Sequence, residues 1–360
     1  MSPPASPRSD ASPTPASQGY RWPAEWEPHA ATWLTWPHNP DTWPGRVERA
    51  EAAFAAIVRA LAGREEVRIN VPDAAAEGRV RWILGPAADA GVRFFHIESD
   101  DAWVRDHGPL FVTREQAPAL AVVDFAFDAW GRKYPPWDRD AAVARRSAEA
   151  LGVPRFGADF VLEPGSIDGD GQGTVLTTES CLLNPNRRAP GEPPRTRERA
   201  ESELERMLGA RRVVWLGDGI VGDDTDGHVD DFARFVAPGR VVCAQEPDTG
   251  DPNHAPLADA LRRLRAARDA SGRALEVVPL PMPPPVLEAG ARCPASYANF
   301  YLANGVALVP TFDAPSDERA IAVLAQCLEG REIVPIEARD LVVGLGTVHC
   351  LTQQVPAAQH

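Results

Sequence analysis

Along this chain, stretches in which apolar residues recur every three or four positions alternate with short apolar runs. The first spacing predicts amphipathic helices, because residues three and four apart share one helix face. The short runs predict strands, so the pattern as a whole indicates an α/β protein. Each helical stretch ends at a glycine, which readily adopts the left-handed conformation that stops a helix. The six stops are Gly63, Gly91, Gly152, Gly209, Gly272 and Gly330.

These glycines recur at a nearly constant interval. From 91 to 152, 152 to 209, 209 to 272 and 272 to 330 the steps are 61, 57, 63 and 58 residues. A fixed period indicates repeated modules, and glycine-containing turns between strand-like runs recur in step with it, as in β-hairpins. Each module of about sixty residues is expected to hold a helix, a strand, a long polar loop and a hairpin. Five such modules favour a ring over a stack, because stacked repeats are usually shorter and need polar caps.

The long polar loops carry nearly all residues with chemical potential. If the modules are related by rotation, the five equivalent loops meet at one place. The sequence therefore predicts a site on the axis of the ring, to which the last strand delivers a cysteine. The loop residues concerned are Asp100, Asp101, Asp106, Glu163, His228, Asp230 and Cys350.

Composition narrows the class of protein. The net charge of −14 disfavours nucleic acid or an anionic membrane surface as a partner and is compatible with a small cationic substrate. No apolar run is long enough for a transmembrane helix. Five cysteines without a CxxC pair, in a chain without a signal-peptide core, fit reduced thiols in a cytoplasm. Residues 1–19, rich in Pro, Ser and Ala, are predicted to form a disordered tail before a single catalytic domain, residues 20–360.

Cys350 is the leading candidate nucleophile. It lies among glycines and polar residues, in "GLGTVHCLTQQ", and a core cysteine, which is the alternative, seldom has such neighbours. His349 would point to the opposite face of a strand, so we expect it to pack or bond locally instead of acting as the base. Cys181, Cys243 and Cys327 lie in apolar surroundings and are expected to pack in the core.

His228 and Asp230 lie two residues apart at a predicted strand start, so both side chains should face one way. An imidazole and a carboxylate aimed together can transfer protons and bind a cation. The alternatives are a solvated acidic loop and a metal site, since "DDTDG" is similar to the start of a calcium loop. No full calcium loop follows and no second His/Cys cluster completes a zinc site, so no metal is expected.

Three further features have simpler readings. Arg105 and Asp106 precede a Gly-Pro break. The alternative to a functional role is that they belong to a turn on the protein surface. The basic stretch "NRRAPGEPPRTRER" is expected to be a solvated loop. Most of the tryptophans near the start of the ordered chain should pack in the core, while one or two could wall a pocket; they are Trp22, Trp26, Trp33, Trp36 and Trp43.

Taken together, these motifs resemble the agmatine deiminase family, which also contains the bacterial peptidyl-arginine deiminases. The resemblance runs from Arg21 to Pro356. The matching stretches are "WPAEWEPHAATWLTWPHNPDTWPG", "DDAWVRDHGP", "FDAWGRKYPPWDRD", "GSIDGDGQGTVLTTESCLLNPNR", "DGHVDDFARF" and "GTVHCLTQQVP". The resemblance implies a five-bladed α/β propeller of the pentein superfamily, with pseudo-fivefold symmetry.

The resemblance also implies roles for particular residues. Cys350 would be the nucleophile and His228 the general acid and base, with Glu163 orienting His228. Asp106 and Asp230 would clamp a guanidinium. The chain departs from the family pattern in two places, reading Glu-Pro-Gly with Pro164 where the family has Glu-Gly-Gly, and Gly-Leu-Gly with Leu345 where three glycines are usual.

The implied activity is the hydrolysis of agmatine to N-carbamoylputrescine and ammonia through a covalent S-alkylthiouronium intermediate, a step of polyamine biosynthesis that needs no cofactor. An acidic pocket suits this dication, with Asp101 nearby and Trp103 or Trp43 facing the distal ammonium. The alternatives are a peptidyl-arginine or free-arginine deiminase, an amidinotransferase, and an inactive guanidine-binding protein. Besides the substrate, the one partner considered is a second copy of the chain in a homodimer.

Overall fold

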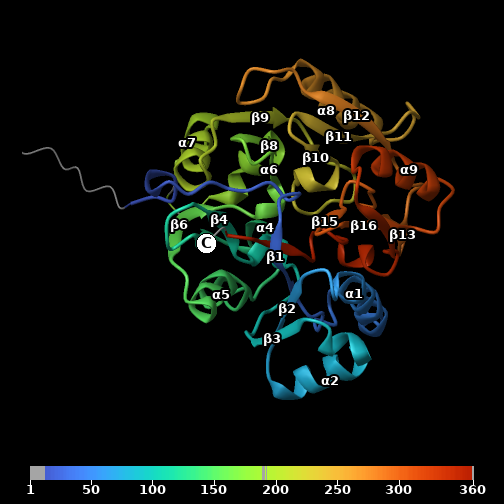
Figure 1. Ribbon diagram of the computed structural model, residues 1–360. Coiled ribbons are helices and arrows are strands. Elements are labelled where there is room, and N and C mark those ends of the chain that lie inside the picture. Colours follow the sequence, from blue (N-terminus) through green and yellow to red (C-terminus); the bar gives the residue numbers. More distant parts are fainter. Residues whose placement is uncertain (1–12, 189–190, 192, 359–360) are drawn as a thin grey trace, which may run out of the picture.

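The same strand arrangement occurs five times in the protein. The computed structural model describes residues 13–188, 191 and 193–358 (Figure 1). In four three-stranded sheets, the middle strand pairs antiparallel with the strand before it and parallel with the strand after it. These sheets consist of β4 (Leu110–Thr113), β5 (Leu120–Ala126) and β6 (Arg155–Val161); β7 (Ile167–Gly169), β8 (Thr174–Thr178) and β9 (Arg212–Leu216); β10 (Ala233–Ala237), β11 (Arg240–Gln245) and β12 (Glu276–Pro281); and β15 (Tyr301–Ala303), β16 (Val306–Thr311) and β17 (Glu332–Glu337).

The fifth sheet joins the two ends of the described chain. Its order is β18 (Gln353–Pro356), β1 (His29–Thr35), β2 (Glu66–Val71) and β3 (Val92–His96). Strand β18 is antiparallel to β1, and β2 is parallel to it, so the sheet repeats the pattern of the other four and adds one strand. The last strand of the chain thus completes the sheet that contains the first.

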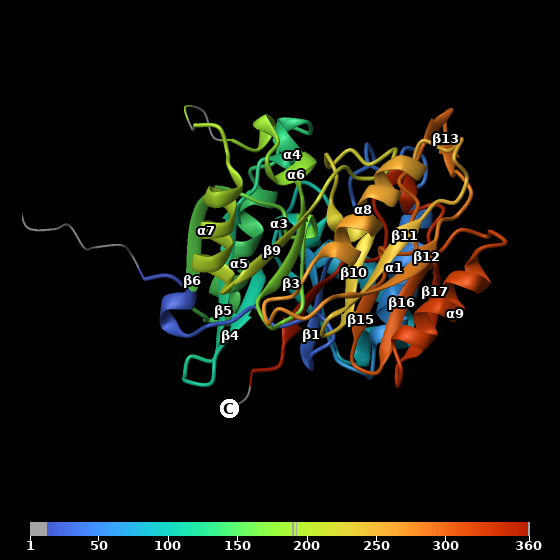
Figure 2. The same ribbon diagram turned by 90° about the horizontal axis from the view of Figure 1, so that it is seen from above.

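A long helix connects the two parallel strands of each unit. In chain order these helices are α1 (Val47–Leu61), α5 (Val143–Leu151), α7 (Arg197–Leu208), α8 (His254–Ala266) and α9 (Asp317–Cys327), while α2 (Ala74–Leu84) leads to the extra strand β3. In Figure 1 these helices lie at the periphery and the sheets lie inside. A small hairpin of β13 (Leu287–Glu288) and β14 (Ala291–Arg292) lies on the same side as the short helix α4 (Ala129–Arg132), opposite the C-terminus (Figure 2).

The predicted modules are therefore confirmed as five repeats of hairpin, helix and parallel strand. All six stop glycines have positive φ, and Gly152 and Gly209 directly follow their helices. Two boundaries were predicted too late, because α2 ends at Leu84, seven residues before Gly91, and α8 ends at Ala266, six residues before Gly272. A 3-10 helix (Gly85–Asp89) follows α2. After α8, the Asp269 side chain accepts backbone N–H bonds from Ser271 and Arg273 and forms a turn instead.

The N-terminal boundary also differs from the prediction. Residues 1–12 of the predicted tail lie outside the described residues, but residues 16–18 form a 3-10 helix followed by Gly19 in the left-handed conformation. The Tyr20 hydroxyl then donates to the carbonyl of Pro118, at 2.6 Å. The predicted boundary at residue 19 is thus later than the first described helical turn.

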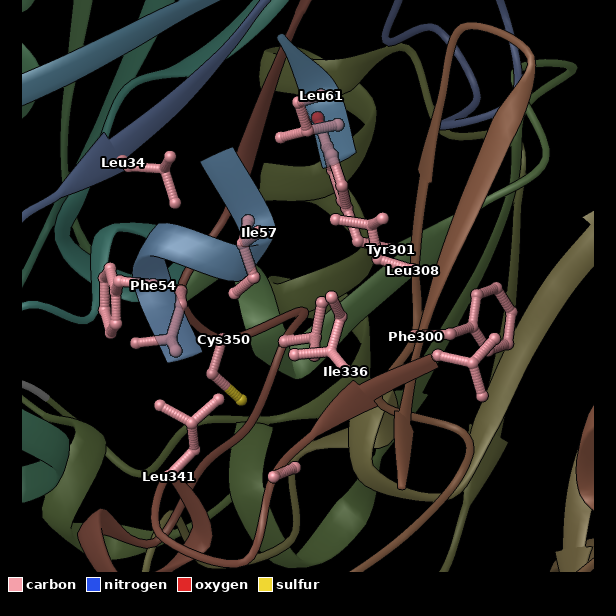
Figure 3. Packing of buried hydrophobic residues seen from close by; sticks show 14 of the residues in the cluster. Leu34, Phe54, Ile57, Leu61, Phe300, Tyr301, Leu308, Ile336, Leu341 and Cys350 are labelled. Carbon is pink, nitrogen blue, oxygen red and sulfur yellow. The ribbon is translucent and has the colours of Figure 1, made fainter. Parts of the chain in front are cut away.

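The largest apolar cluster reaches the candidate nucleophile. Cys350 belongs to the same cluster as Phe54 and Ile57 of α1 and Leu341 (Figure 3). This apolar packing holds the loop that carries Cys350 against the helices and strands around it.

Within the described ranges, no helix combines the length and the apolar character required to cross a lipid bilayer.

Candidate active site

Residues from all five polar loops contact one another, as the sequence predicts. The first loop reaches the second where the Gly165 amide donates to Asp106 Oδ1, at 3.1 Å. The second and third loops meet where His228 Nε2 lies 3.7 Å from Glu163 Oε2. The fourth and fifth meet where Asn299 Nδ2 lies 3.1 Å from the Cys350 sulfur.

Cys350 lies in a turn, not on the final strand as predicted, because β18 begins only at Gln353. Its sulfur is 3.8 Å from Asp230 Oδ2, and 8% of the residue is exposed. Asn299 holds this turn, since its Oδ1 accepts the Thr347 hydroxyl at 2.7 Å and the His349 amide at 3.0 Å. Sequence reasoning missed Asn299, although it ends the fourth polar loop, because nothing local in "CPASYAN" marks it as a partner of a distant cysteine.

His349 does not bond locally, which corrects the prediction. Its Nδ1 lies 2.6 Å from Asp230 Oδ2, and its Nε2 lies 2.8 Å from Glu25 Oε2. The alternation rule failed because it applies to strands and His349 is in a turn. Burial alone would raise the pKa of Asp230, but the hydrogen bond and charge of His349 outweigh it and lower that pKa. His349 thus keeps one proposed clamp ionised.

Glu25, the other partner of His349, is buried and bound by two arginines. Arg234 Nη2 lies 2.9 Å and Arg105 Nη2 lies 3.2 Å from its carboxylate oxygens. Arg105 is therefore not part of a surface turn, since it also donates to Gln354 in the last strand. The N-terminal segment, the first loop and the C-terminal strand meet at this carboxylate.

Both oxygens of Asp106 have a fixed donor. The Gly165 amide donates to Oδ1, and the Trp130 indole N–H donates to Oδ2, at 2.9 Å. Burial raises the pKa of Asp106 to about 6, although His228 opposes the shift. A Cβ atom at Gly165 would lie 2.5 Å from Asp106 Oδ1 and 2.8 Å from His228 Nδ1, so only glycine fits there. Pro164 is tolerated because it begins a 3-10 helix (Pro164–Ser166).

His228 lies between carboxylates, but it precedes a 3-10 helix (Val229–Asp231) and not a strand. Its Nδ1 is 3.6 Å from Asp106 Oδ1 and 4.0 Å from Asp230 Oδ1. The predicted proximity of His228 and Asp230 is therefore present, although it arises from a helical turn. Burial opposes protonation, yet Asp106, and then Cys181 and Glu163, raise the pKa of His228 well above its ordinary value. The carboxylates around His228 thus favour the protonated imidazole.

Glu163 is neutralised by an arginine that the sequence analysis assigned to a solvated loop. Arg187, in the basic stretch, is fully buried, and its Nε lies 2.8 Å from Glu163 Oε1. Burial would raise the pKa of Glu163, but the Arg187 guanidinium lowers it to about 2. The composition of the stretch suggested solvent, whereas the fold buries both Arg187 and Arg195 of this stretch.

The nucleophile has no cationic partner of this kind. Burial, and then the negative charges of Asp230, Asp231 and Asp106, raise the pKa of the Cys350 thiol well above its usual value. The pKa of Asp231 is also raised well above the ordinary value, by burial and then by Asp230. Without a bound cation, this environment favours a neutral Cys350 thiol.

A cavity of about 600 Å³ leads to Cys350. Of the predicted substrate-binding residues, Asp101, Trp103 and Asp106 line it, whereas Asp230 does not. Leu345 also lines the cavity. Trp43 is fully buried and does not line the cavity. It packs behind Trp103, with ring centroids 5.3 Å apart, so it supports the wall instead of facing a ligand.

Leu345 narrows the cavity under conformational strain. Its φ is +70°, which is unfavourable for a leucine. The flanking glycines are required, because a Cβ at Gly344 would lie 2.9 Å from Trp43 and one at Gly346 would lie 2.6 Å from Trp103. The packed tryptophans thereby fix the loop that presents Leu345 to the cavity.

Two buried groups could offer ligands to a metal ion, namely Glu163, Cys181 and His228, and Asp230, Asp231 and Cys350. In the first, Arg187 already supplies the positive charge beside Glu163. The second contains the nucleophile and the carboxylates next to it. The "DDTDG" stretch forms a turn of its own, in which Asp223 accepts the amides of Thr225, Gly227 and His228.

Comparisons with known proteins identify the family to which the chain is similar. A family model described as Porphyromonas-type peptidyl-arginine deiminase matches residues 21–356. Agmatine deiminase of Pseudomonas aeruginosa (strain LESB58) is 40% identical over 367 residues, which cover 96% of this chain and 97% of that protein. The structure of agmatine deiminase from Enterococcus faecalis superposes with a TM-score of 0.89 at 34% identity, covering 97% of this chain and 99% of that one.

A more distant likeness concerns the fold alone. An amidinotransferase from Microseira wollei superposes with a TM-score of 0.53 at 13% identity, covering 95% of this chain and 99% of that one. Such low identity shows a shared α/β architecture and carries no statement about the reaction.

The buried pair of Arg187 and Glu163 gives a stability prediction. Arg187→Met leaves Glu163 buried without its counter-ion, and breaking a buried pair in this way costs about 3–5 kcal/mol. We expect the urea midpoint to fall accordingly, and the double variant Arg187→Met/Glu163→Gln to recover part of the loss.

Arg206→Met is the matched control, because Arg206 pairs with Glu203 on the exposed face of α7 and such pairs contribute about 1 kcal/mol or less. Equal midpoints for Arg187→Met, Arg206→Met and the unchanged protein would show that the buried pair has no structural role.

Proposed function

The chain belongs to the Porphyromonas-type peptidyl-arginine deiminase family, and on that premise we propose that it hydrolyses agmatine to N-carbamoylputrescine and ammonia. One observation carries the proposal: the carboxylates of Asp106 and Asp230 lie 3.6 Å and 4.0 Å from His228 Nδ1, and that of Asp230 also lies 3.8 Å from the Cys350 sulfur. This is the arrangement that a planar cation attacked by a thiolate requires.

Binding follows from the charge and shape of the guanidinium. Its N–H groups form a planar fork that matches carboxylate oxygens and gives charge-assisted hydrogen bonds. Asp106 is held by Trp130 and Gly165, and Asp230 is held by His349. Because these carboxylates are oriented before the substrate arrives, little ordering remains to be done on binding.

The bound cation also prepares the nucleophile. A unit charge about 4 Å from the sulfur stabilises a thiolate by about 4 kcal/mol at an effective dielectric constant of about 20, which equals about three pKa units. The guanidinium thus offsets the repulsion that Asp230, Asp231 and Asp106 exert on the thiolate. The thiol proton passes to a water molecule in the cavity, and Cys350 becomes nucleophilic only when substrate is present.

The reaction then proceeds in two halves. The Cys350 thiolate attacks the guanidinium carbon, and protonated His228 donates its proton to the departing nitrogen, which leaves as ammonia. Neutral His228 next takes a proton from a water molecule that attacks the S-alkylthiouronium carbon. Collapse of this adduct expels the Cys350 thiolate and releases the ureido product. Glu163, kept ionised by Arg187, favours the protonated state of His228 before each cycle.

The cavity favours a dication over a zwitterion. Among the described residues, seven aspartates line it, against Lys133 and Arg139 as cations. Lys133 is paired with Asp224 and Asp226. Three arginines of the polar loops do not line the cavity, namely Arg105, Arg292 and Arg339, and Arg292 is paired with Asp251. The distal ammonium of agmatine is therefore compensated by carboxylates near Asp101 and by the Trp103 ring, while the carboxylate of arginine meets like charge.

Several finer statements belong to the same proposal. The five repeated sheets and the pairing of β18 with β1 support a five-bladed propeller of the pentein type. A cytoplasmic location and a role in polyamine biosynthesis follow from the proposed reaction and from the free cysteines. A homodimer stays a prediction. The alternatives, an arginine or peptidyl-arginine deiminase, an amidinotransferase and an inactive binding protein, are separated by the substrates that release ammonia.

Ammonia release from agmatine, free arginine and an arginyl peptide tests the function. We expect agmatine to exceed arginine in kcat/KM by about a hundredfold, because like-charge contact disfavours the carboxylate, and the peptide to be slower still. Formation of the ureido product without an added amine separates hydrolysis from amidino transfer.

Cys350→Ala, the matched inactive control, should release no ammonia and unfold at the same temperature within a few degrees. Turnover of agmatine by this variant would contradict the mechanism, and equal kcat/KM for arginine and agmatine would contradict the substrate.

Leu345 gives a separate specificity prediction. Leu345→Gly relieves the positive φ and widens the cavity beside Trp103, so the preference for agmatine over arginine should shrink by about tenfold. Leu287→Gly is the control, since Leu287 is 61% exposed on the β13–β14 hairpin and does not line the cavity. An unchanged preference in Leu345→Gly would show that Leu345 does not set specificity.

A further inference from the structure

Four consecutive residues next to the cavity have left-handed backbone conformations. In α4 the φ angles are +53° for Ala129, +56° for Trp130, +88° for Gly131 and +67° for Arg132. Three of the four are not glycine, and such residues are strained in this region, which is rarely occupied by more than one residue at a time. Strain of this kind persists only where surrounding contacts enforce it, and it gathers at functional sites.

The contacts that enforce this turn lie on both sides of it. Asp128 accepts the Gly131 amide at 2.9 Å through its side chain and the Arg132 amide at 2.6 Å through its carbonyl. On the far side, a Cβ at Gly131 would lie 2.6 Å from Asn186, whose amide nitrogen donates to Asp226 at 2.8 Å. The turn is thus wedged against the third loop.

The turn aims one side chain at the proposed clamp. Trp130 donates its indole N–H to Asp106 Oδ2 at 2.9 Å. The indole is held edge to face by Phe127 and Tyr134, with ring centroids 5.3 Å and 5.8 Å away. A right-handed turn would point the indole in another direction. The strained backbone conformation is therefore needed for the hydrogen bond from Trp130 to Asp106.

The residues that follow tie the turn to the loop of His228. Lys133 Nζ lies 3.1 Å from Asp226 Oδ1, and the Tyr134 hydroxyl donates to Asp224. Asp226 in turn accepts Arg187 Nη1 at 2.6 Å, and Arg187 is the partner of Glu163. The turn therefore contacts the surroundings of both Asp106 and His228.

We propose that the left-handed turn at residues 129–132 is a positioning device, in which Trp130 holds the Asp106 carboxylate in the orientation and the ionised state that guanidinium binding needs. The inference rests on the proposed function, since it concerns the same substrate group. It makes Trp130 a positioning residue that acts through Asp106, although its ring also lines the cavity.

The pH dependence of kcat/KM distinguishes this role from packing. Asp106 must be ionised, and its burial places its pKa at about 6, so activity should fall as the pH drops through this region. The charged groups that face Asp106 are His228, Asp230 and Glu163, and Trp130 stabilises the ionised form by hydrogen bonding. Loss of the indole N–H should therefore raise the pKa of Asp106 and move the acid limb to higher pH.

The experiment compares the agmatine pH profiles of the unchanged protein and Trp130→Phe. We expect kcat/KM to fall about ten- to a hundredfold, the range expected for a lost hydrogen bond to a charged group, and the acid limb to shift upward. Trp215→Phe is the matched control, because Trp215 is also buried and donates to a carboxylate, that of Glu201, away from the cavity. Trp215→Phe should keep both the kcat/KM for agmatine and the acid limb of the unchanged protein.

If Trp130→Phe does not fold, the same pH profile is measured for Gly131→Ala. The added Cβ would lie 2.6 Å from Asn186, so we expect it to shift the turn and displace the indole from Asp106. A profile equal to that of the unchanged protein, or a lower kcat/KM with an unmoved acid limb, overturns the inference. Failure of the unchanged protein to release ammonia from agmatine would instead refute the proposed function, and the two outcomes are thereby distinct.

Discussion

Buried negative charge that the protein neutralises only in part is the constraint on which this structure depends. Four carboxylates lie within the site, and an isolated charge in such a place is strongly unfavourable. Arg187 compensates one of them, and the imidazoles of His228 and His349 compensate others. The negative charge that the protein leaves uncompensated lies beside Cys350, where a cationic substrate fits. The carboxylates are those of Asp106, Glu163, Asp230 and Asp231.

Much of the unusual local structure serves this arrangement. Gly165 gives the carboxylates and His228 room to approach one another, and the left-handed turn brings the Trp130 N–H to Asp106. Asn299 fixes the turn that carries Cys350. The repeated sheets supply rigid strands from which five irregular loops can make these contacts, so the chemistry lies in the loops and the stability lies in the repeats.

The sequence alone predicted the repeats, the hairpins and the convergence of the loops, because each rests on local periodicity or on turn residues. It also identified Cys350, His228, Asp106, Asp230 and Glu163 as candidates. It missed partners that are distant in the chain, such as Asn299 for Cys350 and Glu25 for His349, since no local pattern encodes them. It misjudged Arg187 and Arg195, because a basic stretch is expected to be solvated and only the fold buries these two side chains.

The pH dependence of Cys350 alkylation by iodoacetamide, followed by mass spectrometry of the Cys350 peptide, tests the charge account most directly. The account predicts slow labelling at neutral pH in the ligand-free protein, which rises only at a pH well above that at which an ordinary cysteine ionises. In Asp230→Asn, where one negative charge 3.8 Å from the sulfur is removed, the labelling curve should move to lower pH, because less negative charge opposes the thiolate. Rapid labelling of the unchanged protein at neutral pH, with no shift in the variant, would contradict it.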